Sequence, residues 1–445
     1  MRDLKPSNWR SAETAGRDRL GPCDRVTYNG SPTGARDRGS TARPKPRTVQ
    51  SGTEMEDRTR SYLRGRFGDY YADAELSVPP APDAREWGHI PYTESDGTTM
   101  IRHRSLLDMG GDAQSIREFL ERDAPRHAYF SAARYDDPGA SQMAEKGWRG
   151  ADLVFDLDAD HLPGVDETEA SYAEMLRECK RALQRLLDLL RADFGFDDDE
   201  LLIVFSGGRG YHVHVRNDAL LELDSEARRE IVDYLRAVDL DRDDLIRTVS
   251  YDGTTRRELK TGGGWGRRVH RELVEFVADL REQSREDAMD RLTAFDGIGD
   301  GRAGTILDAV ERNPEAIREG NVEAGGPGLR KLVEALSAQV VGNETAPIDE
   351  PVTTDVRRLI RLPGTLHGGT GFVVKPIAPA DLDAFDPLED AVADRFRGQR
   401  IMVNVTEPGP IDVGAETAMD PGPQSVEEYV GVFLMARGRA EKAAE

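Results

Sequence analysis

The feature that most constrains the fold is a pair of short apolar runs separated by one amphipathic segment. The runs are residues 153–155 and 201–205, and each is typical of a buried strand. Between them, apolar residues recur at spacings of three and four, which predicts a helix with one buried face: Tyr172, Met175, Leu176, Cys179, Leu183, Leu186, Leu187 and Leu190. Strand and helix signals alternate from residue 105 to about 215, so we predict a domain that contains both kinds of element.

Length and cysteine content narrow the class of protein. A chain of 445 residues is long enough for about two or three domains. Its two cysteines, Cys23 and Cys179, exclude a disulfide framework and cannot by themselves complete a zinc site with four ligands. We therefore expect a reducing, cytoplasmic location and no structural zinc.

The charge is strongly acidic. The net charge is −23, from 83 carboxylates against 60 basic residues, of which 8 are lysines and 52 are arginines. At face value this argues against a nucleic-acid partner. Such a surface also suits a salt-rich cytoplasm, where the Debye length is about 3 Å at 1 M salt and distant acidic charge no longer repels DNA. No apolar run approaches the roughly 20 residues that cross a bilayer, so we expect no membrane contact.

Residues 1–54 differ from the rest of the chain. They carry 11 basic against 6 acidic residues and lack apolar periodicity. We interpret them as a disordered extension ahead of a start at Met55, with a basic arm that binds nucleic acid as the alternative. A helix containing Tyr62, Leu63 and Phe67 is expected directly after Met55.

The rest of the chain divides by its pattern. Residues 217–345 are polar with helical spacing, which predicts a helical insert in a domain made of residues 55–216 and 346–445. Strand character returns at residues 372–374, and a short final helix is predicted to begin near Val426.

The first candidate site lies at the end of the first apolar run. Side chains alternate along a strand, so Asp156 and Asp158 project from one face while Phe155 and Leu157 pack on the other. Two neighbouring carboxylates repel each other unless a cation lies between them, and hard oxygen ligands suit Mg²⁺ or Mn²⁺. A solvated strand end is the alternative in so acidic a chain.

The second candidate site, residues 206–215, follows the other apolar run. Glycines at 207, 208 and 210 let backbone N–H groups approach an anion, and Arg209 offers a fork that matches phosphate oxygens. His212 and His214 share one face of the strand that follows. A plain glycine turn, or a histidine pair that binds a metal, are the alternatives; no third ligand for such a pair is evident.

The third candidate site, residues 355–371, combines Arg357, Arg358 and Arg361 with a Pro-Gly turn and His367. This is typical of an anion cradle, although a basic helix end before a surface turn would look similar. No nucleophile with a paired base is present in it. The three sites together point to phosphoryl chemistry on a metal-bound polyphosphate.

These segments resemble a known family. Asp156-Leu157-Asp158, Ser206-Gly207-Gly208-Arg209-Gly210-Tyr211-His212 and Arg361-Leu362-Pro363-Gly364-Thr365-Leu366-His367 look like the three motifs of the archaeal and eukaryotic DNA primase small subunit. Their order and spacing agree, and so do flanking segments: Arg85-Glu86-Trp87, Ile101-Arg102-His103 and Lys146-Gly147-Trp148. The resemblance extends from about Met55 to Glu445.

The resemblance implies an α+β fold: a primase-type mixed α/β catalytic domain with an inserted helical subdomain. It implies Asp156 and Asp158 as metal ligands and a third carboxylate before the last motif, a position that Asp349 matches. It further implies that the triphosphate of the incoming nucleotide is held by Ser206, Arg209, His212, Arg361 and His367. Glu86 and Arg102 match positions near the initiating nucleotide.

Other acidic residues near Asp349 are weaker candidates for the third ligand. Glu350 adjoins it, but adjacent residues of an extended segment point to opposite faces. Asp355 stands before two arginines at what looks like a helix start, where capping is the simpler role.

The sequence also departs from the family pattern. Many members carry a small zinc knuckle after the first motif, and this stretch offers His161 and Cys179 alone, so structural zinc is doubtful. His214 stands where some relatives have Trp, and we assign it no role.

The implied activity is synthesis of short RNA, or also DNA, primers on single-stranded DNA from nucleoside triphosphates during replication, by two-metal transfer. The implied partner is a primase large subunit that carries an iron–sulfur cluster, in a heterodimer. The alternatives are a repair or plasmid-type polymerase of the same fold and a metal-dependent phosphohydrolase. The phosphohydrolase would leave the second anion cradle unexplained.

Overall fold

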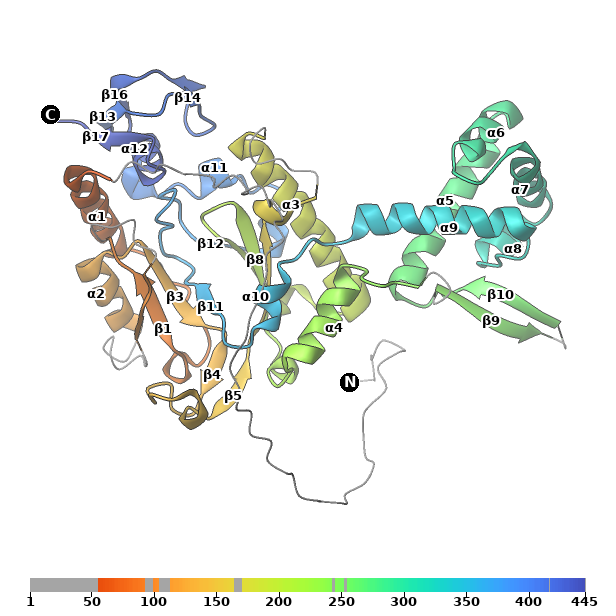
Figure 1. Cartoon of the computed structure of the whole chain (residues 1–445), viewed down its shortest axis with the longest axis horizontal. Helices are drawn as coiled ribbons and strands as arrows, with labels where there is room; N and C mark the ends of the chain where they lie inside the picture. Colours follow the sequence, from red (N-terminus) through yellow and green to blue (C-terminus); the bar gives the residue numbers. More distant parts are fainter. Residues whose placement is uncertain are drawn as a thin grey trace, which may run out of the picture. The chain divides into compact units, whose positions relative to one another are not determined.

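The computed structural model describes residues 55–92, 99–103, 113–163, 170–241, 245–251, 254–415 and 417–444. The predicted basic extension, residues 1–54, lies outside the described residues. Helices are interspersed with strands between residues 113 and 215, where the sequence predicted that the two alternate, and a mainly helical stretch follows (Figure 1). In the described part of the chain, no helix is long and apolar enough to cross a membrane.

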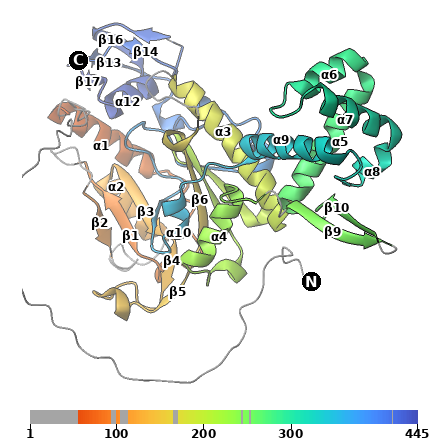
Figure 2. The same ribbon diagram turned by 45° about the vertical axis from the view of Figure 1, so that its right-hand side comes forward.

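The first sheet combines three strands from the N-terminal part of the chain with one strand from the third motif. Its strand order is β11-β3-β1-β2, with antiparallel neighbours. The strands are β1 (Trp87–Ile90), β2 (Ile101–His103), β3 (His127–Ser131) and β11 (Leu359–Arg361). Helices α1 (Asp57–Tyr71) and α2 (Ala113–Asp123) lie beside it (Figures 1 and 2). β11 thereby brings the third motif next to strands from the N-terminal part.

The second sheet contains the strand–helix–strand unit predicted from the sequence. Its order is β12-β7-β8-β6, again antiparallel. The strands are β6 (Leu153–Asp158), β7 (Leu201–Phe205), β8 (Gly210–Val215) and β12 (Lys375–Ile377). Helix α3 (Tyr172–Leu189) packs on β6 and β8, and Ser171 begins it with a capping box completed by Glu174. The Cys179 thiol donates a hydrogen bond to the carbonyl of Leu157, at 3.4 Å, beneath the sheet.

One predicted strand is displaced. Strand character was expected at residues 372–374, but the sheet strand β12 begins at Lys375. The amide of Val374 donates to the carbonyl of Thr365, and Val373 forms a bridge with Leu366. The apolar run therefore closes the loop of the third motif on itself before the chain enters the sheet.

The insert between the two catalytic segments is mainly helical. Its helices are α4 (Ser225–Leu235), α5 (Gly264–Glu282), α6 (Arg285–Thr293), α7 (Asp300–Arg312), α8 (Pro314–Arg318) and α9 (Gly326–Glu344). It also contains an antiparallel hairpin of β9 (Ile246–Tyr251) and β10 (Thr254–Leu259), where the sequence analysis expected helix. β-branched residues such as Ile246, Thr248 and Val249 favour this extended backbone over a helix.

The C-terminal part forms a small sheet with one helix. The sheet order is β16-β13-β17, from β13 (Arg400–Val405), β16 (Gly422–Glu427) and β17 (Ala440–Lys442), with a short ladder of β14 (Gly409–Pro410) and β15 (Ala418–Met419). A short helix, α11 (Pro387–Asp390), precedes it. The final helix, α12 (Glu428–Ala436), begins two residues later than predicted, because Val426 pairs with Ile401 in the sheet.

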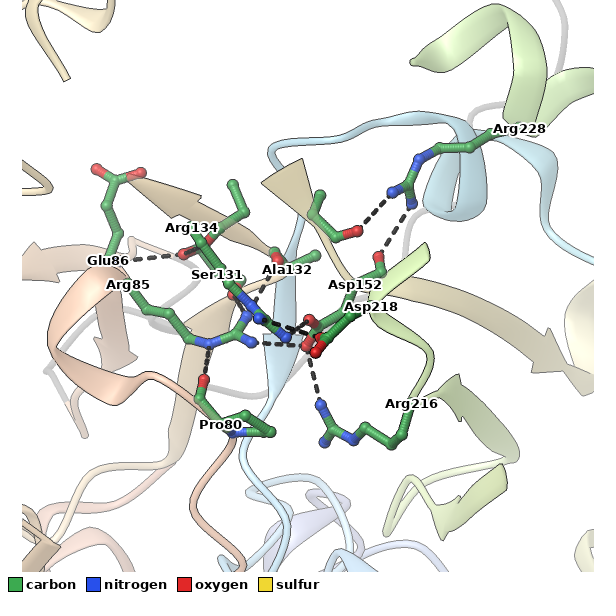
Figure 3. A network of polar contacts seen from close by, with 12 residues as sticks. Pro80, Arg85, Glu86, Ser131, Ala132, Arg134, Asp152, Arg216, Asp218 and Arg228 are labelled. Carbon is green, nitrogen blue, oxygen red and sulfur yellow. Dashed lines mark hydrogen bonds and ion pairs between the residues drawn. The ribbon is translucent and has the colours of Figure 1, made fainter. Parts of the chain in front are cut away.

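A buried charge cluster joins the two catalytic sheets (Figure 3). Asp152 lies between β5 (Trp148–Ala151) and β6, and its side chain is 2% exposed. Arg85 reaches its Oδ2 from the start of β1 at 2.8 Å, Arg134 of β4 (Ala133–Tyr135) reaches Oδ1 at 2.9 Å, and Arg216 reaches Oδ2 from the end of β8 at 2.9 Å. Arg228 of α4 donates to the carbonyls of Asp152 and Ala151. We call Asp152 and these four arginines the arginine hub.

Candidate active site

The three sequence motifs meet at a cavity of about 380 Å³ between the two sheets. Asp156 and His212 enter from the second sheet, and Tyr129 and Arg361 enter from the first. Its lining consists of Met100, Arg102, Tyr129, Asp156, His212, Val352, Asp355, Arg357, Arg358, Leu359, Ile360 and Arg361. The cavity therefore has Asp156 on one wall and arginines on the opposite wall.

Asp156 lies opposite the arginines, and its surroundings alter its pKa. Burial raises its pKa to about 7, and repulsion from Asp158 and Asp349 adds to this effect, while Arg361 and Arg358 oppose it. The Nε2 atom of His212 lies 3.3 Å from its Oδ1. Burial lowers the pKa of His212 to about 3, so this ring is neutral and brings no full positive charge to the carboxylates.

Asp349 is held beside Asp156 by a backbone hydrogen bond. Its amide donates to the carbonyl of Asp156 at 2.9 Å, immediately before α10 (Glu350–Thr354). Its side chain caps no helix amide, although the residue holds the N-cap position. The adjacent Glu350 forms ion pairs with Arg229 at 3.0 Å and Arg236 at 3.3 Å on α4.

Asp355 corrects one expectation. It was predicted to cap the start of a helix, but it follows α10, and its Oδ1 accepts the amide of Arg357 at 2.9 Å. The chain then enters β11, because residues 359–361 pair with β3. The third motif is thus a turn and a strand, and the basic helix end considered as an alternative does not form.

The glycine turn of the second motif is held from inside by Ser206. Its Oγ accepts the amides of Gly208 and Gly210, both at 3.3 Å. Gly207 has a φ of +75°, and a Cβ there would lie 2.6 Å from the Cβ of His367. Glycine is therefore required for the second and third motifs to touch.

Arg209 projects from this turn toward the first motif. Its guanidinium pairs with Asp160 and lies 3.9 Å from the Oδ1 of Asp158. It is one-third exposed. The turn therefore presents a positive charge beside the two carboxylates of β6.

His367 connects to Arg361 through a histidine that the sequence analysis missed. The Nδ1 of His127 accepts the Nη1–H of Arg361 at 2.7 Å, and the rings of His127 and His367 lie 4.8 Å apart, edge to face. Burial and the nearby Arg361 hold the pKa of both rings well below the usual range. Tyr129 completes the group, with its hydroxyl 3.2 Å from Arg361.

The predicted residues thus fall into two adjoining groups. Asp156, His212 and Arg361 line the cavity. The other predicted residues are not part of its lining: Asp158, Ser206, Arg209, Asp349 and His367. Contacts of Arg361 with His127, and of His367 with the glycine turn, link the groups. His127 and Tyr129 share one face of β3, and this alternation was the available signal in the sequence.

Glu86 and Arg102, the predicted pair near the initiating nucleotide, also lie together. Arg102 Nη1 is 3.8 Å from Glu86 Oε2, and Arg102 lines the cavity. Glu86 is buried and binds the Nζ of Lys146 at 2.6 Å. The flanking segments that supported the family resemblance therefore meet at one edge of the site.

The residues considered for zinc or for no role lie apart. Cys179 is fully buried, and burial raises the pKa of its thiol. The side chain of His161 lies outside the described part of the chain. His214 is fully buried beside the Phe130 ring, at 6.2 Å between centroids. Among the described residues, no group of three or more His, Cys, Asp or Glu side chains is close enough to hold a metal ion as it stands.

Comparisons with known proteins agree with this geometry. The family model of the DNA primase small subunit matches residues 155–379, about half of the chain. The DNA primase small subunit of Halorubrum lacusprofundi is 64% identical over 392 residues, which cover 88% of this chain and 100% of that protein. Those of Haloarcula marismortui and Natronomonas pharaonis are 54% and 52% identical, again over 88% of this chain and 100% of each relative. The chain belongs to the DNA primase small subunit family.

Family membership confirms the resemblance seen in the sequence. The chain is a catalytic small subunit of DNA primase, a nucleotidyltransferase. Membership implies a DNA template, nucleotides as substrates and catalysis with divalent metal ions. The relatives named above come from halophilic archaea, as expected from the acidic composition.

Proposed function

We propose that this chain synthesises short RNA primers on single-stranded DNA by two-metal nucleotidyl transfer, with Asp156, Asp158 and Asp349 as the ligands of Mg²⁺ or Mn²⁺. The observation that carries the proposal is the electrostatics of Asp156. Repulsion from Asp158 and Asp349 adds to burial in raising its pKa to about 7, on a cavity whose other wall is made of arginines. Carboxylates brought together in this way bind a cation more readily than isolated ones.

The donor set suits hard divalent ions. Carboxylate oxygens are the ligands that Mg²⁺ and Mn²⁺ prefer, whereas zinc usually takes thiolate or histidine nitrogen. Divalent ions bound there would activate the attacking 3′-hydroxyl and neutralise the charge of the leaving pyrophosphate. The Nε2 atom of the buried, neutral His212 lies 3.3 Å from one oxygen of Asp156, and the Asp349 amide fixes the strand backbone at Asp156.

The nucleotide side of the site is built from Ser206, Arg209, His212, Arg361 and His367. Ser206 shapes the glycine turn, which leaves Arg209 at its tip. Arg361 has no ion-pair partner among the described residues, although carboxylates outnumber basic residues in the chain. An unpaired arginine in so acidic a protein favours a ligand of high negative charge, and a nucleoside triphosphate has that charge.

We also propose a division into domains and a partner for this chain. Residues 55–216 and 346–445 would form the catalytic domain, residues 217–345 an inserted subdomain, and residues 1–54 a basic extension. The two sheets that carry the site both draw strands from the two outer segments, which supports this division. A large subunit would form a heterodimer with this chain and would carry the iron–sulfur cluster. An iron–sulfur cluster usually takes four cysteines, and this chain has two.

The decisive experiment replaces Asp349, Glu350 and Asp355 one at a time, by Asn, Gln and Asn. Primer synthesis on single-stranded DNA and binding of that DNA are measured separately, in high salt with Mg²⁺ or Mn²⁺. Asp349→Asn should abolish synthesis and leave DNA binding intact, because it removes one ligand charge. Glu350→Gln and Asp355→Asn should keep a substantial fraction of activity, because those carboxylates bind Arg229, Arg236 and a backbone amide. An active Asp349→Asn protein would refute the ligand assignment.

A further inference from the structure

Arg437 has a side chain that the described contacts do not neutralise. It is the C-cap residue of α12, and its guanidinium lies over the rings of Tyr172 at 5.1 Å and Phe433 at 5.3 Å. It makes no hydrogen bond or ion pair through its side chain with the residues that the structure describes. One face of the guanidinium is covered by aromatic rings, and the residue as a whole is exposed.

The position of Arg437 is fixed relative to the glycine turn of the second motif. The hydroxyl of Tyr172, on which it stacks, donates to the carbonyl of Gly208. The aromatic rings that cover one face of the Arg437 guanidinium shield it from water, which lowers its pKa, and repulsion from Arg209, next in the turn, adds to this effect. Arg437 in turn contributes to the low pKa of His367. Positive charge from the C-terminal helix thus adds to the cradle formed by the second and third motifs.

The end of α12 is packed rigidly on the loop of the third motif. The rings of Phe433 and Phe372 lie 5.5 Å apart. A Cβ on Gly371, whose φ is +76°, would lie 2.4 Å from the Cγ1 of Val432. The helix therefore cannot shift along this loop without losing buried contacts.

A neighbouring arginine shows what a structural role looks like at this end of the chain. Arg439, two residues later, donates to the carbonyl of Pro410 at 2.9 Å and to that of Glu407 at 3.4 Å. Its donors are used within the fold. A cation after a helix C-terminus is favourable in itself, so Arg437 could serve the helix without lying over Tyr172.

We infer that Arg437 binds a β- or γ-phosphate of the incoming nucleoside triphosphate, from the side of the C-terminal helix. The inference rests on the proposed role of Arg209 and His367 in holding that triphosphate. The planar fork of a guanidinium matches two phosphate oxygens, and stacking on Tyr172 orients the fork before the ligand arrives. A nucleotide with a single phosphate would not reach it.

The test compares four variants of the full chain: Arg437→Gln, Arg437→Lys, Arg439→Gln and Arg209→Gln. Binding of ATP and of AMP is measured by equilibrium dialysis, and KM and kcat for ATP are measured by extension of a primer on poly(dT). Arg437→Gln should weaken ATP binding and raise the KM about 10-fold, with AMP binding changed less than about twofold. Arg437→Lys should lose less, because it keeps the charge, and Arg439→Gln should match the wild type in both affinities.

The outcomes separate this inference from the proposed function. If Arg209→Gln weakens ATP binding and neither Arg437 variant does, Arg437 is structural and the inference is wrong. If Arg437→Gln weakens ATP and AMP binding equally, the effect is a loss of fold and the inference is also wrong. If Arg209→Gln itself binds ATP normally, the residues that hold the triphosphate are misassigned. The proposed role of Arg209 and the inferred role of Arg437 are then both wrong. Should the Gln variant not fold, Arg437→Lys decides, with a KM raised at least about threefold as the supporting result.

Discussion

Asp152 lies just before β6 and Asp156 lies four residues later, near the end of that strand, and the fold neutralises the charge of only one of them. Asp152 is shared by Arg85, Arg134 and Arg216. Asp156 has a neutral histidine beside it and two further carboxylates nearby. One carboxylate is neutralised within the fold, and the other is left with excess negative charge. The difference marks the first as structural and the second as part of a site for an external cation.

The two arrangements depend on each other. Burying Asp152 and Arg85 carries a large desolvation cost, which their mutual attraction and the backbone acceptors of Arg85 must offset. In return the hub ties β1 of the first sheet to β6 and β8 of the second (Figure 3). Because the sheets are locked at one end, the carboxylates at the other end can be held close together against their repulsion.

The largest expected effect on activity follows from replacing Asp156. Asp156→Asn should reduce primer synthesis by at least about 100-fold, because the site loses a ligand charge. The melting temperature should stay the same or rise, because a repulsive charge is removed from the carboxylate cluster. Synthesis assays and calorimetry on the same preparation check both parts. A clear loss of melting temperature would mean that Asp156 is structural like Asp152.

At Asp152 the expected effect moves from activity to stability. Asp152→Asn leaves the buried Arg85 and its neighbours without their counter-charge, so the free energy of unfolding should fall by about 3 to 5 kcal/mol. Activity should fall only as far as the folded fraction falls. Urea unfolding at constant high salt measures the first, and specific activity per folded molecule measures the second. A stable but inactive Asp152→Asn protein would mean that Asp152, like Asp156, takes part in catalysis.

The hub itself should be graded by burial. Arg85 is 0% exposed and donates to three backbone carbonyls as well as to Asp152, so Arg85→Gln should cost about 3 kcal/mol of stability. Arg216 is 20% exposed and leaves Asp152 with two arginines, so Arg216→Gln should cost about 1 kcal/mol. Unfolding curves of the two variants provide the comparison. Equal losses of stability in the two variants would mean that burial does not control how much each arginine contributes.

The sequence predicted the active-site end of this strand better than the hub end. Alternation along residues 153–158 placed Asp156 and Asp158 on one face, and both are partly exposed while Phe155 and Leu157 are buried. The amphipathic spacing predicted α3 closely, because its buried face repeats over five turns. Local patterns of this kind are determined within one element and can be read from the sequence.

The hub could not be predicted in this way. Nothing in the sequence set Asp152 apart from the other carboxylates, because its partners come from residues 85, 134 and 216, on different elements. The contact of His127 with Arg361 depends likewise on β11 pairing with β3 across most of the chain. The hairpin of β9 and β10 was missed because short polar strands resemble polar helix segments when one sequence is read alone.

Binding of Mn²⁺ should stabilise the folded protein, and this effect sharpens the comparison because the cation itself is the probe. An ion that binds the folded state alone stabilises it by RT ln(1 + [M]/Kd), or about 2.7 kcal/mol at 100 times the Kd. In a chain of this length that corresponds to a rise of only a few degrees in melting temperature. The wild type and Arg216→Gln should show the same rise, because the hub takes no part in binding the ion. Asp156→Asn should show little or none, since the remaining carboxylates hold less negative charge. Each protein is first washed with chelator, and the titration is repeated at constant ionic strength with Mn²⁺ replaced by Na⁺ as the non-specific control. A similar rise in Asp156→Asn would mean that Mn²⁺ binds elsewhere on this acidic surface, and the unneutralised carboxylates of β6 would then need another explanation.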